Sequence, residues 1–162
     1  MDARQFLRLA EALIHDLSGR VLLTPTLDAA ACRSATSRAY YAAFHVAHEF
    51  LDRINVVVGQ NPQTHVTVQH ALNNSGDATL ALVNSQLRTL FTDRLAADYD
   101  LAKPAPEQRA LAAVTLALAT DVIDQLDRLA AGSAGVPFDP VAAAAAILNW
   151  AAVTGKTNVK RK

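Results

Sequence analysis

The segment from Arg33 to Ile54 most constrains the fold, because its polar and apolar residues recur with the period of an α-helix. At about 100° per residue, one stripe of such a helix carries a guanidinium, a phenol, an imidazole and two carboxylates, from Arg38, Tyr41, His45, Glu49 and Asp52. The opposite side is apolar, with Tyr40, Ala43, Phe44, Ala47, Phe50, Leu51 and Ile54. The segment therefore predicts a helix with one face in a core and the other face available for chemistry.

The rest of the chain repeats the helical period. Apolar residues at three- and four-residue intervals predict helices over about 3–19, 26–54, 65–74, 77–102 and 106–130. Thr26 is expected to cap the second helix, and Tyr99 is assigned to the apolar side of the fourth. Residues 55–62 read as a loop, with a short strand as the alternative. The predicted fold class is all-α, a five-helix antiparallel bundle followed by an extra C-terminal helix.

That extra helix is an Ala-rich segment over 139–152, which Asp139 is expected to cap. Because the segment is apolar nearly all round, we expect it to be buried, either on the bundle or in a partner. The polar residues from 154 to 162 include four lysines and arginines and are expected to form a flexible tail.

Composition narrows the possible partners. Fifteen basic residues balance fifteen acidic ones, so the chain has no overall field that would hold nucleic acid or an acidic membrane, and any RNA contact must come from a local patch. No run approaches the ~20 apolar residues of a membrane span, and the N-terminus lacks the apolar stretch of a signal peptide. A cytoplasmic location is expected. The single Cys32 lies among alanines and is predicted to be a small core residue.

A family resemblance rests on the polar helix. The run Ser37-Arg-Ala-Tyr-Tyr-Ala-Ala-Phe-His45 closely resembles the signature of HEPN domains, all-helical modules that share an Arg and a His separated by four to six residues. Thr64-His65 and Arg94-Leu-Ala-Ala-Asp-Tyr-Asp100 resemble the family's later landmarks in the same order. The resemblance covers about residues 3 to 131. It implies a HEPN-like domain over 1–135, with an apolar helix at 136–153 and the basic tail at 154–162 beyond it.

The resemblance also implies a function. Family members with this motif act as metal-independent endoribonucleases, many of them toxins or host-defence nucleases, and work as dimers. By this resemblance Arg38 and His45 are the catalytic residues, and the products carry a 2′,3′-cyclic phosphate and a 5′-OH, with no cofactor. Arg38, Tyr41 and His48 are assigned to substrate binding. The supporting residues are Tyr41, Glu49, Asp98 and Tyr99, with Asp98 expected to order Arg38 or His45.

Other interpretations stay open. A solvated helix face often carries Arg, His, Glu and Asp without any further role, and Ala39 stands where nuclease members of the family commonly have a polar residue. The chain could instead be a non-catalytic partner of a minimal nucleotidyltransferase that binds RNA or a nucleotide. It could also be an oligomerisation module built on the 139–152 helix. His65 and His70 are about 140° out of phase on a helix, which is a poor spacing for zinc, and no metal site is predicted.

Overall fold

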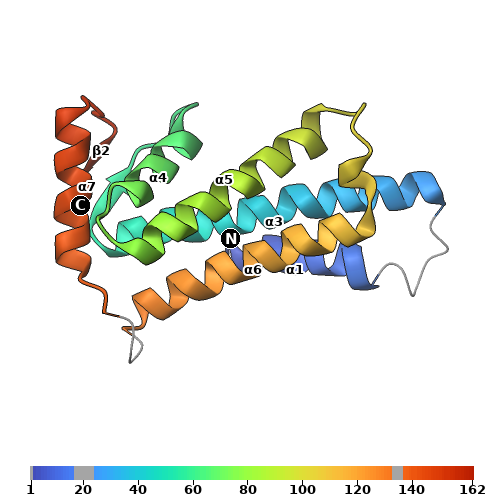
Figure 1. The fold of residues 1–162 in the computed structure, drawn as a ribbon, viewed down its shortest axis with the longest axis horizontal. Helices are drawn as coiled ribbons and strands as arrows, with labels where there is room; N and C mark the ends of the chain where they lie inside the picture. Colours follow the sequence, from blue (N-terminus) through green and yellow to red (C-terminus); the bar gives the residue numbers. More distant parts are fainter. Residues whose placement is uncertain (1, 17–23, 133–136) are drawn as a thin grey trace. The chain divides into compact units, whose positions relative to one another are not determined.

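The computed structural model describes residues 2–16, 24–132 and 137–162, and these are mostly helical (Figure 1). This confirms the expected helical class. The elements, in chain order, are α1 (Arg4–Glu11), the π-turn η1 (Ala12–Asp16), α3 (Pro25–Arg53), β1 (Val56–Val58), α4 (Thr64–Asn73), α5 (Ala78–Tyr99), the 3-10 turn η2 (Ala105–Glu107), α6 (Arg109–Ala130), α7 (Pro140–Val153) and β2 (Val159–Arg161).

The chain divides into two compact units, and α3, α5 and α6 each contribute to both. Unit 1 comprises Met1–Ala43 and Gln86–Val122, and unit 2 comprises Phe44–Ser85 and Ile123–Lys162. Each unit has its own buried apolar side chains. The largest fully buried ones are Tyr40, Leu87 and Leu90 in unit 1, and Leu51, Leu72, Leu80, Leu126 and Ile147 in unit 2.

Helix α3 begins at Pro25, and its cap lies two residues earlier than predicted. The amide of Leu27 donates to Oγ1 of Thr24 at 3.3 Å, so Thr24 caps the helix and Pro25 occupies its first position. The prediction of Thr26 as the cap is wrong, because a proline with its fixed φ and missing N–H is better suited to the first helical position than to a place ahead of the cap. The predicted end of the first helix, at residue 19, lies outside the described residues.

A two-stranded antiparallel sheet corrects two predictions. Val56–Val58 pairs with Val159–Arg161, in a register that sets Val56 opposite Arg161 and Val58 opposite Val159. Residues 56–58 are therefore a strand within the predicted loop, and the predicted flexible tail is wrong for residues 159–161. Val56, Val58 and Val159 are buried on unit 2. A three-residue strand is not stable by itself, so neither half of this pair could be recognised without the other.

Helix α7 lies in unit 2 against β2, β1 and α4 (Figure 1). Asp139 caps it as predicted, since its carboxylate accepts from the amides of Val141 and Ala142 at 2.9 and 3.0 Å. Only one stripe is buried, consisting of Ala143, Ala144, Ile147 and Ala151, whereas Val141 and Val153 are exposed. One side of α7 is thus buried on unit 2, and burial of its other side in a partner stays a prediction. None of the described helices is long and apolar enough to cross a membrane.

Candidate functional site

Helix α3 carries most of the predicted site residues. Its inner side is built largely from small residues, and Ala35, Ala39, Ala42, Ala43 and Ala47 are all buried. Ala39, which departs from the family pattern, is fully buried and belongs to the core of unit 1. The polar positions are distributed over both units: Arg38 and Tyr41 belong to unit 1, and His45, His48 and Glu49 belong to unit 2.

Arg38 is an exposed side chain whose guanidinium is available to a ligand. Its guanidinium carbon lies 5.8 Å from the centroid of the Phe6 ring, which is a cation–π contact with α1. Among the described residues Arg38 makes no side-chain hydrogen bond or ion pair. The five N–H donors of its guanidinium therefore remain free for an anion such as phosphate.

Arg94 organises the predicted site residues of unit 1, and sequence analysis assigned it no role. Its side chain is only 12% exposed. Nη2 donates to the hydroxyl oxygens of Tyr41 at 2.8 Å and Tyr99 at 3.1 Å, and Nε forms an ion pair with Asp98 at 2.7 Å. Its guanidinium carbon also lies over both tyrosine rings, at 5.3 and 4.9 Å from their centroids. Arg94 therefore holds Tyr41, Asp98 and Tyr99 together.

Asp98 pairs with Arg94, whereas the prediction was that it orders Arg38 or His45. Besides the ion pair with Arg94, its carboxylate accepts a hydrogen bond from Oγ of Ser37 at 3.3 Å. The expected contact with Arg38 is absent from this arrangement. The spacing explains the outcome, since Arg94 precedes Asp98 by one helical turn on α5 and an i, i+4 ion pair forms within a single helix.

The aromatic and cationic side chains of unit 1 form one connected series. Arg38 lies over Phe6, the Phe6 and Tyr41 rings are 6.3 Å apart, and Arg94 lies between Tyr41 and Tyr99. We call Arg38, Phe6, Tyr41, Arg94 and Tyr99 the cation–aromatic ladder. It links α1, α3 and α5, so residues far apart in the sequence act on one another through direct contacts.

His45 is half-buried and lies edge-on to the neighbouring Phe44, with ring centroids 5.3 Å apart. Burial lowers the pKa of its imidazole below the usual 6.5, because it disfavours the charged form. The positive charge of a protonated His48 lowers the same pKa further, whereas Glu49 raises it. His45 is therefore mostly neutral at pH 7 and able to accept a proton.

His48, predicted to bind substrate, makes a hydrogen bond to β1. Its Nε2 lies 2.9 Å from the carbonyl oxygen of Val58, and since a carbonyl can only accept, Nε2 carries the proton and donates. This hydrogen bond ties β1 to α3 within unit 2. The centroids of the His65 and Phe44 rings lie 4.2 Å apart, so His65 packs against an aromatic side chain of α3. Glu49 is exposed.

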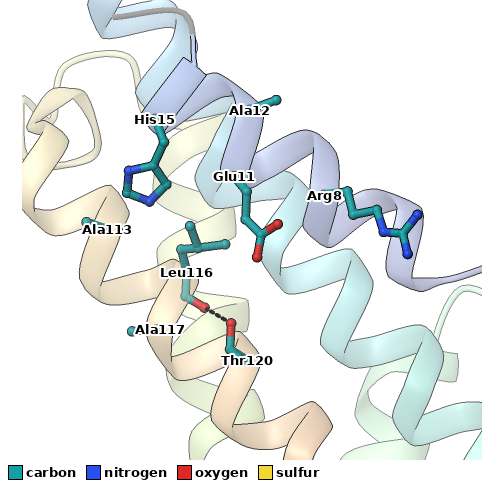
Figure 2. Close-up of a pocket in the computed structure, with 8 residues that line it drawn as sticks. All are labelled: Arg8, Glu11, Ala12, His15, Ala113, Leu116, Ala117 and Thr120. Carbon is teal, nitrogen blue, oxygen red and sulfur yellow. Dashed lines mark hydrogen bonds between the residues drawn. The ribbon is translucent and has the colours of Figure 1, made fainter.

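A separate cleft of about 770 Å³ lies in unit 1 between α1–η1 and α6, and none of the predicted site residues lines it. Figure 2 shows His15 and Glu11 projecting toward α6, whose wall consists mainly of Ala113, Leu116 and Ala117. Thr120 on that wall bonds back to the carbonyl oxygen of Leu116 at 3.0 Å. The cleft is open to solvent, and its polar side chains, Arg8, Glu11, His15 and Thr120, are separate from the predicted site residues.

Within the described ranges, no group of three or more His, Cys, Asp or Glu residues has an arrangement that could hold a metal ion. In comparisons with known proteins, no family model, curated protein or solved structure matches this chain.

Proposed function

We propose that the chain is a HEPN-type domain and a metal-independent endoribonuclease, a toxin or defence component that acts as a homodimer in the cytoplasm. The observation that carries the proposal is the chemistry of helix α3. Arg38 and His45 lie on the same helix, α3. The guanidinium of Arg38 is exposed and has no hydrogen bond or ion pair to the described residues. The imidazole of His45 has a lowered pKa. The type of reaction, RNA cleavage to a cyclic phosphate, is proposed from the resemblance of residues 37–45 to the HEPN signature.

In this reaction neutral His45 takes the proton of a ribose 2′-OH, and the oxygen then attacks the adjacent phosphorus. The 5′-oxygen leaves and is protonated, which gives a 2′,3′-cyclic phosphate and a 5′-OH end. Arg38 would hold the phosphate and stabilise the charge that builds up on its oxygens. The lowered pKa of His45 suits the role of base, because the imidazole is unprotonated at neutral pH.

The reaction also needs an acid for the leaving oxygen. The Nε2–H of His48 donates a hydrogen bond to the carbonyl oxygen of Val58, so His48 is poorly suited to act as this acid. A homodimer would bring a second Arg38 and His45 to the RNA, and the second His45 would supply the acid in the small protonated fraction that its lowered pKa leaves at neutral pH. Light scattering at micromolar concentration tests this requirement, and a monomer that still cuts RNA would contradict it.

The decisive experiment is a labelled-RNA cleavage assay with excess EDTA and analysis of the product ends. General acid–base catalysis contributes about 10²–10⁴ in rate, so His45→Ala should lose most of the cutting, and Arg38→Ala should lose it as well. His70→Ala and Arg88→Ala are matched controls, because both side chains are exposed and neither is assigned to the site. If the wild type does not cut, or if His45→Ala cuts as fast, the nuclease proposal is wrong.

The second candidate is a non-catalytic partner of a nucleotidyltransferase-type antitoxin. The engaged Nε2 of His48 favours it, because one protomer then offers His45 alone on this stretch of α3 for proton transfer. In this case Arg38 still binds phosphate and His45→Ala leaves binding unchanged. Binding of RNA or a nucleotide without cleavage, and without loss in His45→Ala, would select this function. The oligomerisation module has less support, because the buried stripe of α7 packs within unit 2.

A further inference from the structure

Tyr99 ends the cation–aromatic ladder and is held in place although it is exposed. About 70% of its surface is accessible, which is unusual for a large aromatic residue in an ordered helix. Arg94 fixes it twice, through the hydrogen bond to its hydroxyl and through the guanidinium over its ring. The guanidinium covers one ring face, so the high exposure leaves the other face open to solvent. The ring is thus a preoriented flat surface.

The acidic residues around this ring are neutralised, so they do not repel a polyanion. Asp98 is paired with Arg94 and Asp100 with Lys103 at 3.4 Å, so the acidic residues at this end of α5 have cationic partners. At the other end of the ladder, Arg38 has donors to spare. A ligand that combines flat rings with phosphates matches both ends, since aromatic rings stack on nucleobases and guanidinium groups bind phosphate.

We propose that the open face of Tyr99 stacks a nucleobase of single-stranded RNA, with Arg94 as the positioning residue that holds the ring. This inference rests on the proposed function, because it takes RNA as the ligand. The base would extend the ladder, so that base, Tyr99, Arg94 and Tyr41 form a continuous stack. Bases in a duplex are already stacked and paired, so the site selects single strands.

The test measures RNA binding by fluorescence anisotropy on the His45→Ala protein, which prevents cleavage during the titration. The probes are a short labelled strand, the same strand with abasic residues, and the same strand annealed into a duplex. Tyr99→Ala should weaken binding of the single strand by about 5- to 150-fold, the range for loss of one stacked base. Tyr99→Phe is the matched control, because it keeps the ring and the guanidinium over it and loses only the hydrogen bond to Arg94, so it should bind far more tightly than Tyr99→Ala. Neither variant should change duplex binding.

Salt dependence separates stacking from charge. When a protein neutralises one phosphate fewer on a single strand, the slope of log K against log salt becomes shallower by about 0.7. Arg38→Ala should reduce the slope by about that amount, whereas Tyr99→Ala should lower affinity at an unchanged slope. Arg94→Ala should weaken binding of the intact strand and leave binding of the abasic strand unchanged, as expected if Arg94 acts through Tyr99. Circular dichroism of each variant checks that the helices are retained.

The outcomes distinguish this inference from the proposed function. If the wild type cuts RNA but Tyr99→Ala binds the single strand as Tyr99→Phe does, or the abasic strand loses as much affinity as the intact one, stacking on Tyr99 is wrong and the nuclease stands. If single strands bind through Tyr99 but are never cut, the nuclease falls and the stacking site stands. A wild-type protein that binds no RNA overturns both.

Discussion

Replacing Arg33 tests whether one buried guanidinium holds the end of helix α5. Arg33 is buried at 9% exposure and is fully paired. Nη1 donates to the carbonyl oxygens of Ala96, Ala97 and Asp100, and Nη2 donates to those of Leu101 and Lys103, at 2.6 to 3.4 Å. Glu107 accepts from Nε and Nη2 at 3.0 and 2.9 Å. Arg33 therefore satisfies carbonyls that a helix end leaves without intrahelical partners, within unit 1.

The magnitude follows from these contacts. Removing one partner of a buried ion pair costs about 3–5 kcal/mol. Water can reach part of this network, since the Glu107 side chain is 38% exposed, so the lower end of that range applies. We expect Arg33→Ala to lower the free energy of unfolding by about 3 kcal/mol, equivalent to about 6–12 °C in Tm for a chain of this length.

Urea and thermal unfolding followed by circular dichroism measure this change. Arg33→Lys should lie between wild type and Arg33→Ala, because an ammonium group has three donors and cannot reproduce the planar fork. Arg88→Ala is the control, since an exposed arginine on α5 should change stability by less than about 0.5 kcal/mol. If Arg33→Ala stays within about 1 kcal/mol of wild type, the carbonyl contacts do not carry the stability that this reasoning assigns to them.

Two further predictions concern pH and helix capping. Because the folded pKa of His45 is lowered from 6.5, its contribution to stability should be fully present above pH 6.5 and be lost as the pH falls through the folded pKa. Urea unfolding across this range should show the loss of stability in the wild type and not in His45→Gln. The cleavage rate should also fall on the acidic side only below pH 6.5. An equal pH dependence of stability in His45→Gln would show that His45 is not the titrating group. Asp139→Ala removes the cap of α7 and should lower the free energy of unfolding by about 1 kcal/mol, whereas Asp139→Ser should retain most of it. Equal stability of the wild type and both variants in urea unfolding would show that the cap is dispensable.

Local patterns in the sequence were enough for the helical elements. The apolar period, the capping carboxylate of Asp139 and the burial of Cys32 are properties of a few neighbouring residues, and all three are confirmed. The stripe on α3 likewise depends only on helix geometry, so Arg38, Tyr41 and His45 could be selected as candidates before any fold was known. Whether they act on RNA stays a prediction.

Tertiary structure decided the features whose partners are distant in the chain. The strand Val56–Val58 exists because Val159–Arg161 pairs with it, and His48 on α3 makes a hydrogen bond to that strand. Arg94 contacts Tyr41 on α3 as well as Asp98 and Tyr99 on its own helix, so only the packing of α3 against α5 reveals its position among the unit 1 site residues. Sequence periodicity assigned Tyr99 to the apolar side of its helix, yet the ring is largely exposed and its contact is the guanidinium of Arg94. Periodicity reports the direction of a side chain from its own helix, and only the packing of other elements determines what lies in that direction.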